Sequence, residues 1–359
     1  MLITLIHSTT LRVALASLVL GLVASAAPAL SVTISGPDVV SDVKNLRLKV
    51  TVTNTGQEAL KLINEPGSPL ITSPTDSFLI TGPTKVNPTF AGISVKYAGV
   101  DMVAANGSSN TFTMLDVGKS ITVTHNLSKR YNFKDSGPGK YTFDTAGLFY
   151  YVDNDKRAVS IKAATKSHQL VLQGKLSAPN RRSVERKFAT FDNCTAVEQT
   201  DINSAVTNAR AYVADAITFL TAHTNTTTRM TTWFGVFREH RRLFVLSNFN
   251  SLTTRGDEFS GWNYDCSQQD CVPGSYAHVH HLDFAEVHLC ERFWTAPATG
   301  TDSKAGTLVH EGTHFAVTAN TEDLANGKPD CVDLAKRRPG KAARNADSYQ
   351  YFAENNPPL

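Results

Sequence analysis

Cysteine is missing from the first 193 residues of this 359-residue chain, and all five cysteines lie between positions 194 and 331. A cysteine-free front half cannot supply a thiolate to a metal. The five cysteines include no C-x-x-C pair, so a dithiol redox motif is also absent. Their presence suits an oxidising destination, and the odd count leaves at least one thiol without a partner in the chain.

Other functional signatures are missing as well. The chain has no glycine-rich phosphate loop and no nucleophile elbow. The basic run at 336–338 is too short for a nucleic-acid patch. After residue 23, no apolar run is long enough to span a bilayer. We therefore expect a soluble globular protein with no nucleic-acid partner and no membrane partner, as 41% hydrophobic and 19% charged residues also indicate.

The N-terminus has the composition of an export signal. Arg12 precedes an apolar stretch at 13–23, and the small residues Ala24, Ser25 and Ala26 follow. A basic start, a short apolar run and an A-x-A end are typical of a cleaved secretory signal, and the run is too short for a membrane anchor. We predict a signal peptide at 1–26 and a secreted, extracellular mature protein.

Residues 27–176 have the pattern of an all-β domain. Apolar and polar residues alternate at 46–53, and similar runs recur at 120–124 and 148–152, with turn residues between them. Several short strands at this spacing predict a small immunoglobulin-like sandwich. The following segment, 177–187, is polar and contains a proline and two dibasic pairs. We interpret it as a proteolytic processing linker, with an ordinary basic connection as the alternative.

The net charge of +3 conceals two oppositely charged halves. Residues 1–187 hold 21 Lys and Arg against 12 Asp and Glu, a balance of +9. Residues 188–359 hold 14 against 20, a balance of −6. An acidic back half would attract basic substrates, and a basic front half could dock on it first.

The back half, 188–359, has a mixed pattern. Apolar residues at helical spacing predict a helix at 198–223. Extended chain is expected at 276–290, and further helices are expected at 234–248, 305–319 and 346–354.

One of these helices carries a chemical motif. His310, Glu311 and His314 form the pattern H-E-x-x-H. Histidines four residues apart lie on one helical face and can bind a tetrahedral zinc, while the glutamate can take a proton from water at the metal. A chance match on a surface helix is the alternative.

Two histidines leave zinc one protein ligand short, and the third ligand distinguishes the zincin classes. A metzincin needs Gly three residues and His six residues after the second histidine, where this chain has Val317 and Asn320. Two candidates remain: Glu354 on a later helix, and Asp323, nine residues after His314.

The back half resembles the fungal deuterolysin family, the aspzincins, and especially its peptidyl-Lys metalloendopeptidase branch. The resemblance extends over nearly the whole half and includes the stretches 231–235, 287–294, 300–311 and 345–357. The front half is similar to the propeptide of such enzymes. The implied fold is an α+β zincin-type catalytic domain preceded by an all-β immunoglobulin-like propeptide domain.

The resemblance implies the roles of several side chains. His310, His314 and Asp323 would bind one zinc ion per catalytic domain, and Glu311 would be the general base. Asp347, in an Asn-Ala-Asp motif, would lie at the bottom of the pocket for the residue after the cleaved bond. A carboxylate there would select lysine. Capping of the last helix is the alternative role for this aspartate.

The resemblance also implies how the cysteines pair. Cys194 would bond to Cys266 and Cys271 to Cys290. Cys331 would then be a free thiol or have a partner outside the chain.

The chain departs from the family pattern G-T-x-D-x-x-Y-G after the second histidine. Residues 320–327 read N-T-E-D-L-A-N-G, so Asn320 replaces Gly and Asn326 replaces Tyr. Asn320 tolerates the left-handed backbone that a glycine would adopt. The family tyrosine is understood to donate to the oxyanion, and loss of such a donor costs roughly a hundredfold to a thousandfold in rate. Asn326 keeps a donor on a shorter side chain, while Tyr349 and Tyr351 are candidate substitutes.

Histidines are concentrated in the segment predicted to be extended, at His278, His280, His281 and His288. A second metal site is conceivable there. Because alternate residues of a strand face opposite sides, exposed or core histidines are the preferred interpretation.

These observations predict a secreted, monomeric zinc metalloendopeptidase made as a proenzyme. It would cut protein or peptide substrates before Lys or in basic, Lys-rich proteins, and its own propeptide would be an intramolecular inhibitor. The alternative is a catalytically silent secreted zinc protein that binds basic peptides, favoured by Asn326 and opposed by the retained Glu311. A cell-surface adhesin is disfavoured because the chain shows no anchor or repeat.

Overall fold

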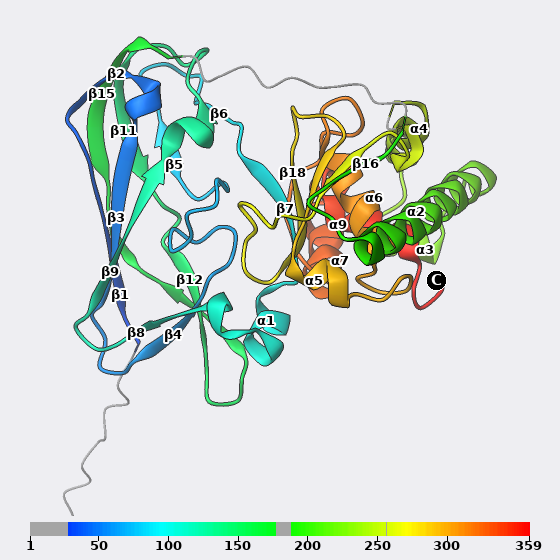
Figure 1. Cartoon of the computed structure of the whole chain (residues 1–359), viewed down its shortest axis with the longest axis horizontal. Coiled ribbons are helices and arrows are strands. Elements are labelled where there is room, and N and C mark those ends of the chain that lie inside the picture. Colours follow the sequence, from blue (N-terminus) through cyan, green and yellow to red (C-terminus); the bar gives the residue numbers. More distant parts are fainter. Residues whose placement is uncertain (1–27, 177–187, 256) are drawn as a thin grey trace, which may run out of the picture.

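The computed structural model describes residues 28–176, 188–255 and 257–359. The predicted signal peptide and processing linker therefore lie outside the described residues. A β-rich half, 28–176, lies beside a half of mixed α and β structure, 188–359 (Figure 1). The secondary structure predicted for each half from the sequence is of the same kind. Across the described residues, no helix combines the length and the apolar character needed to cross a membrane.

The front half forms β-sheets around its own apolar core. In β3, for example, Leu48, Val50 and Val52 are buried and alternate with more exposed residues, as the 46–53 pattern predicts. One sheet has the strand order β14 (Ala164–Lys166), β1 (Leu30–Ser35), β3 (Arg47–Asn54) and β9 (Ser120–Asn126), and a second has the order β2 (Val39–Asp42), β15 (His168–Lys175), β11 (Gly139–Asp144) and β5 (Leu79–Thr81). A third sheet has the order β13 (Ala158–Lys162), β12 (Leu148–Val152), β4 (Leu60–Ile63) and β8 (Phe112–Leu115). The short strands β10 (Tyr131–Asn132) and β6 (Thr89–Phe90) pair with each other.

A further sheet draws strands from both halves. Its order is β16 (Thr190–Asp192), β17 (Asn263–Asp265), β19 (Glu286–Leu289), β18 (Ser275–His280) and β7 (Ile93–Tyr97). In Figure 1, the cyan strand β7 leaves the front half and runs beside the yellow strand β18 of the back half.

Helices surround this sheet in the back half. Together with α1 of the front half, they are α1 (Val100–Asn106), α2 (Ala196–Ala222), α3 (Thr228–Phe234), α4 (Glu239–Thr254), α5 (Glu291–Thr295), α6 (Lys304–His314), α7 (Lys328–Arg337), α8 (Pro339–Ala342) and α9 (Ala346–Glu354). The predicted helices 198–223 and 346–354 correspond to α2 and α9, and the predicted extended segment contains β18 and β19.

Local chemistry explains where α2 begins. The Thr195 side chain accepts from the backbone of Glu198, and the Glu198 side chain accepts from the backbone N–H of Thr195. This capping box satisfies N–H groups that the first turn leaves open. Apolar residues at helical spacing, including Ile202, Ala209 and Val213, then bury one face of the helix.

Two predicted helices have wrong boundaries. The prediction 234–248 begins too early, because Gly235, with φ of 74°, ends α3 and α4 starts only at Glu239. It also ends too soon, because α4 continues to Thr254. The prediction 305–319 runs too far, because the chain leaves the helix at Phe315. There Phe315 packs against the ring of Trp262, and this tertiary contact overrides the local helical pattern.

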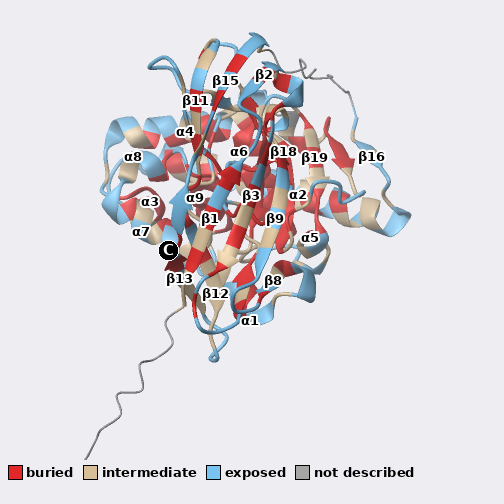
Figure 2. Ribbon diagram, turned by 90° about the vertical axis from the view of Figure 1, so that its left-hand side faces the viewer, coloured by how far each residue is buried: buried red, intermediate tan, exposed pale blue. Residues whose placement is uncertain are grey.

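Helix α6 is enclosed along its whole length, as α9 is. All eleven of its residues are buried, and Figure 2 shows it among the buried elements of the molecule. Ser303 caps its first turn by accepting from Gly306 N–H at 2.9 Å. Gly306 lets α9 approach closely, because a Cβ atom there would lie 2.0 Å from Glu354 Oε1.

We predict that Gly306→Ala lowers the free energy of unfolding by about 1–3 kcal/mol, since the added methyl group displaces Glu354. Denaturant unfolding of the full chain measures this. Gly340→Ala is the control, because a Cβ atom at Gly340 meets no atom within 4 Å. Equal stability of the two variants would contradict the close approach of α6 and α9.

Candidate metal centre

The two motif histidines lie on the last turns of α6 with their rings directed at a common point. Their Nε2 atoms are 3.1 Å apart. His314 Nδ1 lies 2.9 Å from the carbonyl oxygen of Thr321, and His310 Nδ1 lies 2.8 Å from Asp347 Oδ1. Because His314 Nδ1 faces a carbonyl oxygen, it carries the ring proton, and its Nε2 keeps a lone pair for a metal. His310 Nδ1 lies at ion-pair distance from Asp347 but makes no well-aligned hydrogen bond among the described residues.

A tight turn after α6 brings Asp323 back to the histidines. Thr321 N–H donates to the Thr313 carbonyl at 3.0 Å, which folds the chain onto the helix. Asn320 has φ of 48°, the left-handed conformation expected of a residue that replaces glycine. Asp323 Oδ1 consequently lies 3.2 Å and 3.3 Å from the two imidazole Nε2 atoms.

The three atoms fit a zinc ion. They lie 3.1 to 3.3 Å from one another, and a tetrahedral ion with bonds of about 2.0–2.1 Å separates its ligand atoms by roughly 3.3–3.4 Å. Both histidines are fully buried, and the Asp323 side chain is 21% exposed. Asp323 Oδ1 is buried with no hydrogen-bond donor among the described residues, an arrangement that a cation satisfies.

Glu354, the alternative third ligand, lies at the opposite end of α6. Its carboxylate accepts from the backbone N–H of Ser303 at 2.9 Å and of Asp302 at 3.1 Å. It therefore holds the start of the helix, and the geometry favours Asp323 as the partner of the histidines.

Glu311 lies beside this cluster in a fully buried position. Its Oε1 accepts the backbone N–H of Lys96 at 3.1 Å, and its Oε2 has no partner among the described residues. Burial raises the pKa of the Glu311 carboxyl to about 8; the negative charge of Asp323 adds to this, while His314 and Lys96 oppose it. A carboxyl with a pKa near neutrality can both take up and release a proton.

Asp347 lies behind His310 at the bottom of a closed pocket. Its Oδ1 is 2.8 Å from Lys96 Nζ as well as from His310 Nδ1, and its Oδ2 accepts the Gly327 N–H at 2.7 Å. Burial alone would raise the pKa of this carboxyl, but the Lys96 ammonium and the His310 ring outweigh burial and lower it. These three contacts all lie outside α9, and no side chain caps the start of that helix, so the helix-capping alternative does not describe its role.

Two further residues contact the ammonium group of Lys96. We call Asp347, Asp302 and Tyr351 around this group the lysine pocket. Asp302 Oδ1 lies 3.1 Å from Lys96 Nζ, and Tyr351 Oη lies 3.4 Å from it and donates to Asp302 at 2.7 Å. Asp302 is not among the residues predicted from the sequence, and Tyr351 is predicted there as an oxyanion donor and not as a contact of Lys96. The spacing of Asp302 and Tyr351 in the sequence does not indicate a shared site, because these two residues come together only when α9 packs against α6.

The three candidate oxyanion donors, Tyr349, Tyr351 and Asn326, lie in different environments. Tyr349 is fully buried and donates to the Ala343 carbonyl, and Tyr351 lies in the lysine pocket, so neither is the substitute donor that we considered. Asn326, in contrast, lines a cleft of about 500 Å³ together with Asp323. The cleft also has walls from the front half, among them Val95.

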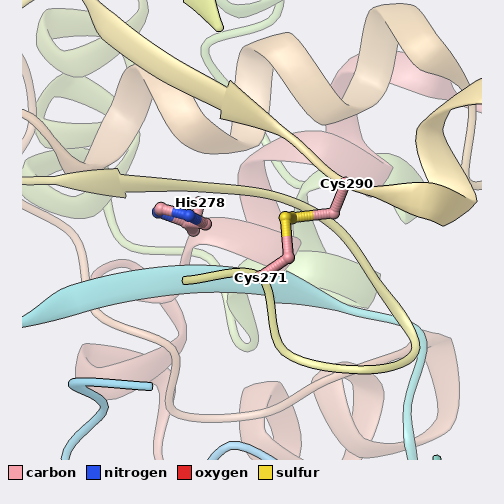
Figure 3. Close-up of side chains that lie close together, drawn as sticks. All are labelled: Cys271, His278 and Cys290. Carbon is pink, nitrogen blue, oxygen red and sulfur yellow. A yellow bond between two sulfur atoms is a disulfide. The ribbon is translucent and has the colours of Figure 1, made fainter. Parts of the chain in front are cut away.

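Both implied disulfides are present. Cys194 is bonded to Cys266 and Cys271 to Cys290, whereas Cys331 is a buried free thiol. Figure 3 shows that the second bridge lies close to His278.

This second cluster has no ligand set for a metal, because its two sulfurs are bonded to each other. His278 stacks on His288 at 4.6 Å, and its Nε2 lies 2.9 Å from the Gln269 carbonyl. Burial lowers the pKa of His278 to about 3, so the ring is neutral. The core-histidine interpretation fits this residue.

A buried His-His-Asp cluster with an adjacent glutamate defines the class of zinc metalloendopeptidases. Comparisons with known proteins agree. A family model described as lysine-specific metallo-endopeptidase matches residues 219–354. The chain is 40% identical to the peptidyl-Lys metalloendopeptidase of Grifola frondosa over 97% of its own length and 99% of the relative. It is also 40% identical to that of Armillaria mellea, over 98% and 99%.

A more distant relative is named extracellular protease, from Aeromonas hydrophila, with 30% identity over 87% of this chain and 89% of the relative. The chain belongs to the aspzincin family, and it is a zinc metalloendopeptidase.

We predict that Asp347→Asn weakens zinc binding by roughly tenfold to a hundredfold, because the carboxylate orients and polarises His310. Competition with a chromophoric chelator on the full chain measures this. Asp333→Asn is the control, since Asp333 is exposed on α7 and pairs with Arg337. Unchanged affinity in Asp347→Asn would show that the contact with His310 does not support the metal.

Proposed function

We propose that this chain is a secreted proenzyme whose back half hydrolyses peptide bonds on the N-terminal side of lysine, in Lys-rich or basic proteins. One observation carries the lysine preference. The buried carboxylate of Asp347, which also contacts His310, is paired at 2.8 Å with a lysine ammonium. Secretion is supported by the export-signal composition of 1–26, by the two disulfides and by the relative named extracellular protease.

The proposed organisation follows the boundaries predicted above. Residues 1–26 would be a signal peptide, 27–176 an immunoglobulin-like propeptide, 177–187 the linker cut near Arg182 or Lys187, and 188–359 a monomeric enzyme. The separate apolar core of the front half supports its role as a domain of its own. Its strand β7 lies in the back half's sheet, which supports intramolecular inhibition.

We assign the metal to His310, His314 and Asp323, with one zinc ion in the catalytic domain. When bound, zinc supplies Lewis-acid activation of water and of the peptide carbonyl. Glu311 takes the proton of the attacking water and passes it to the leaving amine. The 3.1 Å contact between its Oε1 and a backbone N–H supports the second of these roles.

Substrate recognition falls to the pocket behind His310. Asp347 and Asp302 receive the ammonium group, and Tyr351 orients Asp302. A neutral side chain is disfavoured in this pocket because it would leave the buried Asp347 carboxylate and the partly buried Asp302 carboxylate without a cation. Asn326 is the proposed donor to the oxyanion.

The silent-binding-protein alternative is not favoured. Glu311 is buried beside the metal cluster with one carboxylate oxygen unpartnered among the described residues, and a structural zinc site has no use for it. The relatives that cover nearly the whole chain are named as endopeptidases.

The first test is to digest a lysine-rich protein with the processed enzyme and map the cut bonds by mass spectrometry. We expect cuts immediately before Lys that a zinc chelator abolishes, and none from the Glu311→Gln variant. Chelator-sensitive cuts at other residues would leave the protease but refute the lysine preference. No cuts from a folded, zinc-loaded enzyme would instead support the binding protein.

A second test addresses the oxyanion donor. Asn326→Tyr should raise kcat by roughly tenfold or more, because one well-placed donor is worth a hundredfold to a thousandfold in rate. Asn320→Gly, which restores the other family residue but adds no donor, is the control and should leave kcat nearly unchanged. A kcat that stays the same in Asn326→Tyr would show that position 326 does not contact the oxyanion.

A further inference from the structure

Strand β7 of the front half lies along the strand that borders the candidate active site. It pairs antiparallel with β18, with Val95 opposite His278 and Lys96 opposite Ala277. In the sheet order, β18 would be an edge strand if β7 were absent. Addition of a strand to a free edge is a common way for a protein to bind an extended peptide. Strand β7 therefore lies along β18 as an extended peptide would, and it forms one wall of the cleft.

The side chain of Lys96 fills the lysine pocket completely. It has no exposed surface, and its ammonium contacts Asp347, Asp302 and Tyr351. Burial alone would lower the pKa of this amine, but the carboxylates outweigh burial and hold it well above its usual range. An ammonium can be buried only with such compensation, so the pocket is complementary to a charged lysine.

The backbone contacts of Lys96, independently of its side chain, also place this residue where the lysine of a substrate is expected. Its amide N–H donates to Glu311 Oε1 at 3.1 Å, and the preceding N–H, of Val95, donates to Asp323 Oδ2 at 2.8 Å. In a bound substrate, the nitrogen of the cleaved bond is the atom that receives a proton from the catalytic glutamate. The nitrogen of the Val95–Lys96 bond occupies that place.

We propose that Lys96 is an internal substrate mimic: the front half closes the active site by placing its own lysine in the pocket for the substrate lysine. This inference rests on the proposed lysine preference of the back half. It identifies one residue of the propeptide, among many lysines in that half, as the one that competes with substrate.

The test uses the full zinc-loaded chain in the Glu311→Gln background, so that nothing is cut. The probe is a fluorescein-labelled Ala-Gly peptide with one central Lys, and a matched peptide has norleucine at that position. Lys96→Met should bind the Lys peptide roughly tenfold more tightly or better than the parent, because the pocket is then free. Lys85→Met, which changes a lysine outside the pocket, should bind like the parent, and the norleucine peptide should gain nothing from Lys96→Met.

A second measurement needs no substitution of Lys96. Mass spectrometry after brief amine acylation should find Lys96 unmodified in the Glu311→Gln chain, and an excess of the Lys peptide should increase its modification while the norleucine peptide should not. A lysine with only a structural role would stay protected in both cases.

The outcomes separate the two proposals. If the processed Glu311→Gln enzyme binds the Lys peptide but Lys96→Met gains no affinity and Lys96 stays protected, the substrate-mimic inference is wrong and the lysine preference stands. If the processed enzyme does not distinguish the Lys peptide from the norleucine peptide, the lysine preference itself is wrong.

Discussion

The burial of one carboxylate, that of Asp347, connects the main parts of this structure. The side chain is fully buried, and a buried charge is tolerated only with close partners. Its partners come from three places: His310 on the metal helix, the Gly327 N–H at the start of α7, and Lys96 on the front-half strand β7. The proposed metal site, the proposed lysine pocket and strand β7 of the front half therefore meet at one carboxylate.

This sharing has a consequence for activation. Removal of one partner from a buried ion pair costs about 3–5 kcal/mol when the other charge stays buried. When the front half leaves, the ammonium of Lys96 leaves with it, and Asp347 and Asp302 lose their cation. Water or a substrate lysine then has to take its place. The same electrostatic requirement that holds the proposed propeptide in the cleft thus favours the proposed substrate after processing.

The two halves of the chain have opposite net charges, and specific ion pairs join them at the lysine pocket. Residues 1–187 carry a balance of +9 and residues 188–359 a balance of −6, which suggests a diffuse attraction. In the cleft, however, Lys96 forms ion pairs with two carboxylates at 2.8 and 3.1 Å, away from solvent. Such a buried contact is screened by salt much less than exposed charges are.

The sequence by itself determined the local features. The H-E-x-x-H spacing places His310 and His314 on one face of α6, and apolar periodicity predicted α2 and α9, because both depend on residues three or four positions apart. Resemblance to a family added Asp323, Asp347 and the cysteine pairs, which no periodicity encodes. The boundary at His314 and the roles of Tyr349 and Tyr351 were decided by tertiary packing.

The lysine pocket belongs wholly to the tertiary structure. Lys96 and Asp347 are 251 positions apart. No local pattern distinguishes a lysine that faces solvent from one that enters another domain's pocket. Only the pairing of β7 with β18 puts this amine between Asp347 and Asp302, because the register of the strands determines which side chain faces the cleft.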